Sequence, residues 1–392
     1  MAMCVEDRIS SFPDHILFHI LSFLPIKDAV RTSIISTKWR YLFASISTIK
    51  FDGSLMSGLT DRNVDSFKNF VDRLLKFPDQ EIDLDLKNLG DTLPALLFTC
   101  HSLVTLKLDA VDSEIKVPSD VCLGNLKTLQ LRNSVLFGDS IHRLISNCHV
   151  LEDLAFIECG FDISEVNIQS PSLKRLVLEF DVTEGRYFNY VVVINAPILV
   201  YFQYHAAVAA SYTLSTMKSL EKADISIYQF DSINSETSAT HLIQGICNVR
   251  SLSLTTDAAI FLTSGLPIFH NLIEFKYLGV GFNGRETWLV EFLHCVPNLK
   301  TLTLNFPDDA GTRWKALRMK VPSCLSFHLK EIEISYFDPR MIEMVSYFLD
   351  NAMVLEKLKI STAALTWSQK WGAQIKLLQL LKRSKKSLIV IL

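Results

Sequence analysis

Two short stretches of the sequence combine residue types and spacings that are associated with chemistry. The first, GVGFNG at residues 279–284, is a literal G-x-G-x-x-G, and Asp308 follows after the next expected strand. In dinucleotide-binding domains such a turn holds the pyrophosphate and a later acidic residue binds the ribose. Here the same strand-loop-helix-strand order recurs along the chain in units without such glycines. The pattern therefore favours a repeat loop over a nucleotide site.

The second stretch, HILFH, places His15 and His19 four residues apart. In zinc metalloproteases two histidines at this spacing bind the metal and a glutamate between them acts as general base. That glutamate is missing here, and no serine, cysteine or histidine stands in a context typical of nucleophilic catalysis. We predict a protein without catalytic residues, metal or cofactor, in which both histidines are polar flanks of a helix.

The eight cysteines favour neither disulfides nor zinc, because they are spread along the chain without a C-x-x-C pair. They are Cys4, Cys100, Cys122, Cys148, Cys159, Cys247, Cys295 and Cys324. The N-terminal MAMCVEDRIS carries acidic residues where a secretion signal would be basic and then apolar. We therefore expect reduced, buried thiols and a protein of the cytoplasm, the nucleus or both.

Composition and charge limit the partners. Of 392 residues 49% are apolar and 21% charged, and the net charge of -3 gives no general reason to expect nucleic acid or an anionic membrane. The stretch from Tyr187 to Met217 is uncharged, which raises the question of a membrane span. Polar residues and a break at residues 195–197 favour two buried strands instead. A basic cluster, residues 382–386, could serve nuclear import but is more typical of a solvated helix end.

Internal repeats dominate the rest of the chain. The pattern L-x-x-L-x-L, as in LKTLTL from Leu299, occurs in eleven strict or looser copies. The copies start at residues 103, 126, 151, 173, 199, 220, 249, 272, 299, 329 and 355. Between them lie stretches with helical spacing, such as Ile141, Leu144, Ile145 and Cys148.

A strand with one apolar face and a helix with one apolar stripe cannot bury themselves alone, so neighbouring units must stack. This predicts a curved leucine-rich-repeat solenoid, with parallel strands on the concave face and helices on the convex face. Curved solenoids bind partners on the concave face, where outward strand residues lie. Our candidate substrate contacts there are Thr105, Lys107, Gln130, Asp153, Arg175, Glu274, Lys276, Thr301 and Thr303.

The first fifty residues follow a purely helical pattern. Ser11 and Asp14 suggest a capping box, Pro13 suits a first helical turn, and apolar residues recur at helical spacing until Pro25. Two further short helices follow, the last with Ser36 as its expected cap. Three helices in so few residues leave apolar surface uncovered, which needs a partner. That partner is either the first repeat or another protein.

Residues 9–43, ISSFPDHILFHILSFLPIKDAVRTSIISTKWRYLF, resemble an F-box, the module that docks receptor subunits onto the Skp-type adaptor of cullin-RING ubiquitin ligases. The Pro-Asp start, the ILSFLP run and STKWRYL all match in register; Phe12 and Lys38 depart from the commoner Leu and Arg. The resemblance implies that the adaptor contacts are Pro13, Ile16, Leu17, Ile20, Leu21, Leu24, Pro25, Trp39 and Leu42. For each of them, packing inside the three helices is the alternative.

The C-terminal part, CLSFHLKEIEISYF from Cys324 and EMVSYFLDNAMVLEKLKI to Ile360, resembles the FBD domain of plant F-box proteins. The tail KRSKKSLIVIL lacks the cysteine-containing end of that domain. We therefore expect an α/β chain with an F-box at residues 5–50, leucine-rich repeats at 51–320 and an FBD domain at 321–392 that continues the solenoid.

The resemblance implies a non-catalytic substrate-recognition subunit of an SCF-type ligase. The F-box would hold the adaptor and, through it, cullin and RING subunits, while the solenoid presents a substrate protein whose identity the sequence does not give. Two alternatives remain: a scaffold that binds the adaptor without cullin, and a small-molecule receptor. Against the latter, the solenoid is short, and no phosphate-binding cluster of Lys and Arg stands out in the sequence.

Overall fold

A computed structural model of the chain describes most of its repeats and part of its N-terminal segment. The described residues are 9–24, 48–52, 82–87, 95–137, 139–162, 164–180, 190–228, 235–256, 265–279, 288–306, 320–362 and 388–391, with isolated positions within 28–42 and 375–380. The chain divides into two compact units. Unit 1 comprises residues 1–163 and 168–173, and unit 2 comprises 164–167 and 174–392.

Unit 1 begins with helix α1, Asp14–Phe23. Pro13 occupies the N-cap position, directly before the first helical turn where it was expected. The helix ends because Leu24 is extended, with ψ 141°, which is the conformation favoured before a proline. The predicted cap at Ser36 is supported, since its Oγ accepts a hydrogen bond from the Trp39 amide at 3.4 Å.

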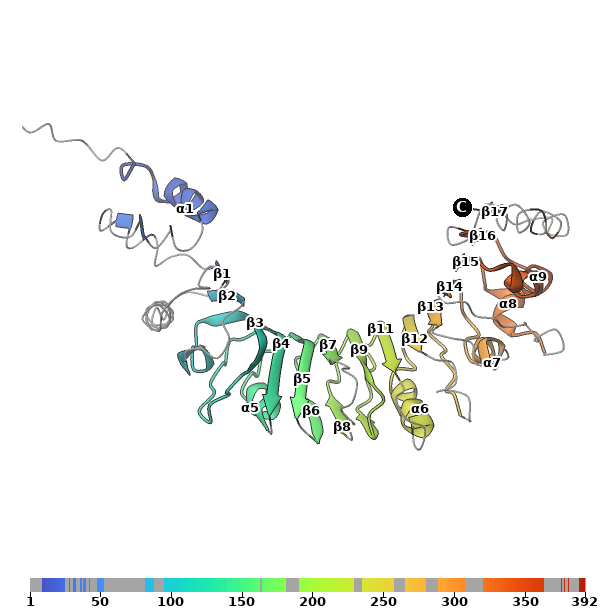
Figure 1. The fold of residues 1–392 in the computed structure, drawn as a ribbon, viewed down its shortest axis with the longest axis horizontal. Helices are drawn as coiled ribbons and strands as arrows, with labels where there is room; N and C mark the ends of the chain where they lie inside the picture. The colour runs from blue at the N-terminus through green and yellow to red at the C-terminus, as the bar shows by residue number, and fades with distance from the viewer. Residues whose placement is uncertain are drawn as a thin grey trace, which may run out of the picture. The chain divides into compact units, whose positions relative to one another are not determined.

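The strands of unit 1 form a parallel succession in chain order (Figure 1). They are β1 (Thr48–Asp52), β2 (Ile82–Lys87), β3 (Leu103–Glu114), β4 (Thr128–Phe137) and β5 (Asp153–Asp162), with η2 (Ala95–Phe98) and α5 (Ser140–Ser146) between them. The predicted helix at α5 is confirmed: Ile141, Leu144 and Ile145 are buried, and so is Cys148, two residues after the helix ends. Strand β6 (Glu165–Gln169) follows where the units divide.

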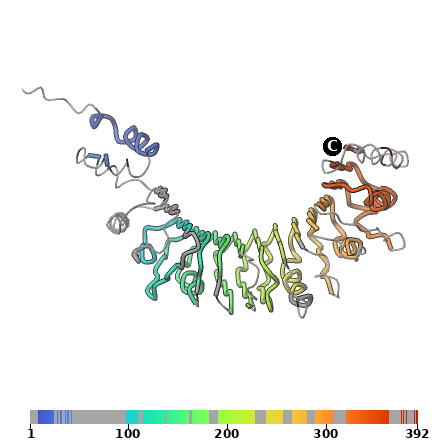
Figure 2. The backbone as a smooth tube through the Cα atoms, viewed as in Figure 1, coloured from blue at the N-terminus to red at the C-terminus, as the bar shows by residue number. Residues whose placement is uncertain are grey.

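Unit 2 is built in the same way, and its main strands again pair in parallel with their neighbours. Figure 2 traces the successive repeats of its backbone. These strands are β7 (Arg175–Phe180), β9 (Tyr201–Ala207), β11 (Lys222–Tyr228), β12 (Ser251–Thr256), β13 (Glu274–Gly279), β14 (Thr301–Asn305), β15 (Glu331–Ser335), β16 (Lys357–Ile360) and β17 (Leu388–Ile391). The helical segments are α6 (Ser235–Gly245), α7 (Trp288–His294), α8 (Ser323–Phe327), η5 (Pro339–Met341) and α9 (Ile342–Asn351).

Every one of the eleven predicted repeat copies forms a strand, which confirms the leucine-rich-repeat prediction. In β14 the burial alternates as expected: Leu302 and Leu304 are buried, whereas Thr301 and Thr303 are partly exposed. The first apolar residue of each copy is at most 4% exposed. These residues stack from repeat to repeat, so the core of each unit is a continuous apolar layer behind the strands.

A second regularity joins the repeats just before each strand. The residue that precedes the first leucine of a copy often donates a side-chain hydrogen bond to a backbone carbonyl of the previous repeat. Asn125 Nδ2 donates to His101 O and Asn298 Nδ2 to His270 O, both at 2.8 Å. Such bonds satisfy carbonyls that the turn leaves without a strand partner. They hold the amino ends of neighbouring strands in fixed positions.

The uncharged stretch from Tyr187 to Met217 forms strands, as predicted, but three rather than two. Strand β8 (Val191–Asn195) precedes β9, and β10 (Ser211–Leu214) pairs with β8 in a small separate sheet. Three buried tyrosine hydroxyls hold this region together: those of Tyr190 and Tyr204 are 2.6 Å apart, and Tyr212 donates to Tyr204 at 3.2 Å. No helix in the described part of the chain is long and apolar enough to cross a membrane.

The glycine of GVGFNG that the structure describes has a packing role. Gly279 is the last residue of β13 and is buried. A Cβ at this position would lie 2.8 Å from the Tyr277 ring and 3.1 Å from that of Phe306. The close approach of two rings therefore accounts for a glycine here. Gly281, Gly284 and Asp308 lie outside the described residues.

Candidate functional site

The N-terminal module has a small apolar core of its own. Leu17 and Leu21 of α1 pack with Trp39 and Leu42, and all four are at most 4% exposed. Trp39 Nε1 donates to Ser10 Oγ at 2.8 Å. This bond ties the Trp39 ring to the segment just before α1.

This core divides the nine predicted adaptor contacts. Leu17, Leu21, Trp39 and Leu42 are enclosed, so in this structure they are core residues of the module and not part of its surface. Leu24 is partly buried against the same core. The exposed members are Pro13, Ile16 and Ile20. Pro25 lies outside the described residues.

The outer face of α1 is apolar as well. Ile16, Ile20 and Phe23 are 39%, 37% and 75% exposed, and their spacing places them on one side of the helix. Ile9 and Phe12, just before the helix, are 56% and 48% exposed. We call these five residues the α1 stripe. Scattered exposed apolar residues are ordinary, whereas a contiguous group of this kind marks an interaction surface.

Three members of the α1 stripe were not among the predicted contacts: Ile9, Phe12 and Phe23. The sequence does contain a signal for Phe23, because it holds two sets of apolar residues at helical spacing. Ile16, Ile20 and Phe23 form one set, and Leu17, Leu21 and Leu24 form the other, one position later. Two apolar stripes on one short helix mean that one faces the module and the other faces outward. Which stripe is inside depends on the packing of Trp39.

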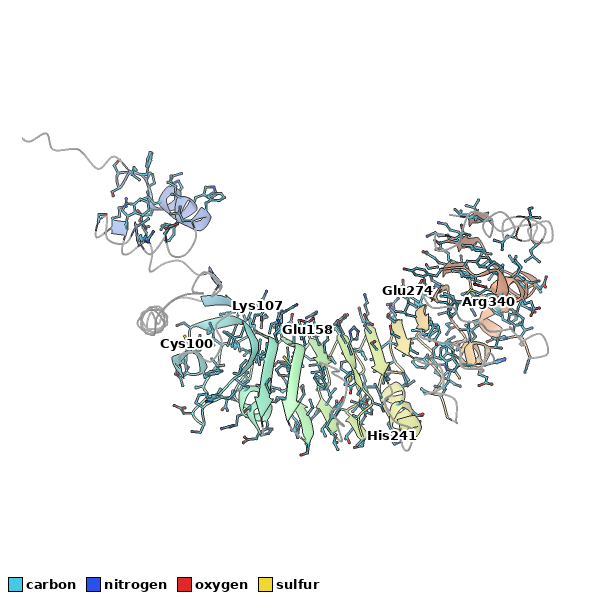
Figure 3. All side chains as sticks on the ribbon, in the orientation of Figure 1. Cys100, Lys107, Glu158, His241, Glu274 and Arg340 are labelled. Atoms are coloured by element: carbon cyan, nitrogen blue, oxygen red, sulfur yellow. The ribbon has the colours of Figure 1, made fainter. Side chains whose placement is uncertain are left out.

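The predicted substrate contacts all lie at partly or fully exposed strand positions and are divided between the two units. Four belong to unit 1, where Lys107 on β3 is in register with Gln130 on β4. Five belong to unit 2, where Glu274 is in register with Thr301 and Lys276 with Thr303. Figure 3 shows Glu274 on the open strand face of this unit and His241 on helix α6 at the opposite side. The full set, by chain order, is Thr105, Lys107, Gln130, Asp153, Arg175, Glu274, Lys276, Thr301 and Thr303.

A group of side chains in mutual contact surrounds Tyr201 on the strand face of unit 2. The Arg175 guanidinium lies 5.1 Å from the centre of the Tyr201 ring, and Lys222 Nζ lies 6.0 Å from it. Both distances are within the range of cation–π attraction. The Tyr201 hydroxyl donates to Gln203 Oε1 at 2.8 Å. This Tyr201 cluster spans β7, β9 and β11, and only Arg175 of it was predicted.

An acid and a base extend this surface. His205 Nε2 and Asp224 Oδ1 are 3.4 Å apart. Burial by itself raises the pKa of the Asp224 carboxyl, but the neighbouring His205, a hydrogen bond from Ser253 and the charge of Lys222 outweigh it and lower the pKa below its usual value. Asp224 is therefore ionised at neutral pH. The group offers fixed polar and aromatic contacts to a partner.

The described cysteines and possible metal ligands add no further site. All described cysteines are free; Cys100, Cys148, Cys159 and Cys324 are buried as predicted, whereas Cys122 is exposed, contrary to the prediction. Among the described residues no three His, Cys, Asp or Glu side chains gather as a metal site would require. Cross-strand ion pairs such as Lys359–Glu333, at 3.2 Å, are exposed enough to contribute little stability.

Comparison with known proteins supports the assignment of both parts. An F-box domain model matches residues 9–50, and the model of the At1g61320/AtMIF1 LRR domain matches residues 89–388. The F-box/LRR-repeat protein At3g59250 of Arabidopsis thaliana is 32% identical, over 91% of this chain and 90% of its own. The F-box/FBD/LRR-repeat protein At5g22660 of the same plant is 29% identical, over 91% and 90%. With a helical F-box module ahead of parallel leucine-rich-repeat strands, this chain belongs to the F-box/LRR-repeat protein family.

Proposed function

We propose that this protein is the substrate-recognition subunit of an SCF-type cullin-RING ubiquitin ligase. Its F-box docks a Skp-type adaptor, and its leucine-rich repeats and C-terminal FBD region bind the protein to be ubiquitinated. Proteins of this family are generally SCF substrate adaptors without catalytic activity. The observation that carries the proposal is the α1 stripe on a module that matches an F-box.

The exposure of the α1 stripe sets the strength of docking. Burying a large apolar side chain completely is worth about 1.5 to 3 kcal/mol. Scaled by the exposed fractions of the five residues, full coverage of the stripe contributes about 4 to 8 kcal/mol before the cost of association. This is enough to anchor a complex when polar contacts at the rim add to it. Leu17, Leu21, Trp39 and Leu42 act through the shape they give to the helix.

In this role the protein accelerates ubiquitination by position alone. The substrate is held near a conjugating enzyme that carries ubiquitin. This raises the effective concentration of the substrate at the reacting centre. The strand faces supply the contact surface, with the Tyr201 cluster as its best ordered part. Aromatic and guanidinium groups are the residue types that most often carry the binding energy of protein interfaces.

The adaptor contact can be tested with the full chain and a purified Skp-type adaptor. Ile20→Ala combined with Phe23→Ala should weaken binding by about 2 to 3 kcal/mol, or roughly 30- to 150-fold, in titration calorimetry. Both side chains are exposed, so the fold should be kept. The matched control, Ile268→Ala with Met353→Ala, removes apolar groups that are 54% and 71% exposed in unit 2 and should leave binding unchanged. Equal affinity of the stripe variant and the wild type would refute this docking face.

Co-purification from plant cells tests the ligase assignment. The wild type should recover adaptor and cullin together, and the stripe variant neither. Recovery of the adaptor without cullin would instead identify a scaffold outside the ligase. Proximity labelling under proteasome inhibition then compares wild type and stripe variant, and proteins enriched by the variant are substrate candidates.

A further inference from the structure

A polar pocket lies at the amino ends of five neighbouring strands of unit 2. Its volume is about 540 Å³. The lining comes from short segments that end where β11, β12, β13, β14 and β15 begin. Its ionisable residues are Lys218, Glu221, Arg250, His270, Lys300 and His328.

The pocket has an excess of positive charge. Lys218, Arg250 and Lys300 are permanent cations and Glu221 is the single acid, so the lining carries three positive charges less one, or +2, with both histidines neutral. None of the three cations makes a side-chain hydrogen bond or ion pair with another residue in the described part of the chain. Further along the same edge Lys330 does have a partner, since its Nζ lies 2.7 Å from Glu356. The charge of the pocket is thus available to a ligand.

The backbone that carries these cations is held in place. The amides of Arg250 and Lys300 donate to the carbonyls of Glu221 and Ile273, both at 2.8 Å. His328 Nδ1 donates to the Pro297 carbonyl at 3.0 Å. Arg250 and Lys300 stand before strands two apart in the sheet, roughly 10 Å from each other, so their long side chains can converge on one group between them. Binding a ligand here therefore costs little entropy for ordering the backbone.

We propose that this pocket binds an anionic segment of the substrate protein, centred on a phosphorylated side chain or on a pair of carboxylates. The proposal rests on the function proposed above. A phosphate carries close to two negative charges at neutral pH, which match the +2 of the lining, and forms strong charge-assisted hydrogen bonds with Arg and Lys. An extended peptide laid across the strand ends would meet one repeat after another.

A nucleic acid suits this surface less well than a peptide. A nucleic-acid backbone needs a continuous basic track, whereas here the excess is confined to one pocket and the net charge of the chain is -3. The sequence alone gave no such cluster, because each repeat contributes only one or two of these residues. Parallel stacking of the repeats brings them together.

The test uses the full chain and three immobilised peptide pools with random flanks around a central phosphoserine, a pair of glutamates or a serine. The wild type should be retained by the phosphoserine or the glutamate pool and not by serine; which pool it is tells the two anion sources apart. Inorganic phosphate should compete. Arg250→Gln with Lys300→Gln should lower retention about tenfold or more.

The matched control is Lys116→Gln with Lys127→Gln, which removes the same charge in unit 1 and should change nothing; Lys127 holds the repeat position of Arg250 and Lys300. Equal retention of pocket variant and wild type, or wild-type retention by a single-stranded oligonucleotide but by neither anionic pool, would overturn the proposal. The pocket variant should still bind the Skp-type adaptor. Failure at the pocket is thereby separated from failure of the adaptor contact.

Discussion

Replacement of Gly245 by alanine tests how tightly helix α6 packs on β10. Helix propensity alone favours the change, since alanine is about 1 kcal/mol better than glycine inside a helix. The structure predicts the opposite sign. A Cβ on Gly245 would overlap Leu214 Cδ1 and would lie 2.9 Å from the Leu214 Cβ and 3.1 Å from its Cγ. A rotamer change can move the outer atoms, but the Leu214 Cβ moves only with the β10 backbone.

Overpacking of this kind costs about 1 to 3 kcal/mol. Because Gly245 is the last residue of α6, the propensity gain is smaller than in the helix interior, and we expect Gly245→Ala to destabilise α6 by about 1 to 2 kcal/mol. A chain of this size is not expected to unfold in one step. Native-state hydrogen exchange at the α6 amides measures the local opening free energy directly.

Two further variants make the result decisive. Leu214→Ala removes the outer atoms of the overlap, so the double variant should be more stable than the sum of the single effects by about 1 kcal/mol. Gly124→Ala is the control, because no atom lies within 4 Å of its added Cβ, and protection should stay the same or rise slightly. Normal protection of α6 in Gly245→Ala, or strict additivity with Leu214→Ala, would refute the reasoning.

Two other predictions follow from ionisable groups. The folded chain lowers the pKa of Asp224 from 3.8, so the stability that its ionised form contributes is complete above this value and is lost as pH falls through the lower, folded pKa. Asp224→Asn should therefore be less stable than wild type at pH 6 in thermal unfolding, and the difference should shrink as pH falls below 3.8; a constant difference would contradict this. Iodoacetamide at pH 8 should modify the exposed Cys122 well before Cys148 and Cys324, since burial raises the pKa of both buried thiols to about 12. Peptide mass spectrometry reads the order, and early labelling of Cys324 would show that its burial is incomplete.

The sequence predicted the strands well because their signal is local. Each L-x-x-L-x-L copy contains its own period-two alternation, and stacking needs nothing more. Strand β2 was missed although Ile82, Leu84 and Leu86 alternate with acidic residues, because the segment departs from the leucine template. β10 was missed because this segment of four residues is too short to be distinguished from the preceding strand by its pattern.

The candidate sites were harder, because they depend on register and on packing between distant segments. The pairing of His205 with Asp224 requires β9 and β11 to align at one particular offset, which composition does not encode. The division of α1 into an inner and an outer stripe depends on Trp39, eighteen positions after Leu21. The basic pocket needs five repeats in parallel order. In each case the sequence shows the residue types, but only the folded structure shows which of these residues lie close together.

The apolar outer side of α1 also has a consequence for the life of the free polypeptide. Newly made molecules without a bound partner expose the apolar face of α1. Exposed apolar surface of this kind is what chaperones and degradation machinery recognise. Yield in a recombinant host should then depend on whether an adaptor is co-expressed. In the cell, the concentration of the adaptor would then set the steady-state level of this protein.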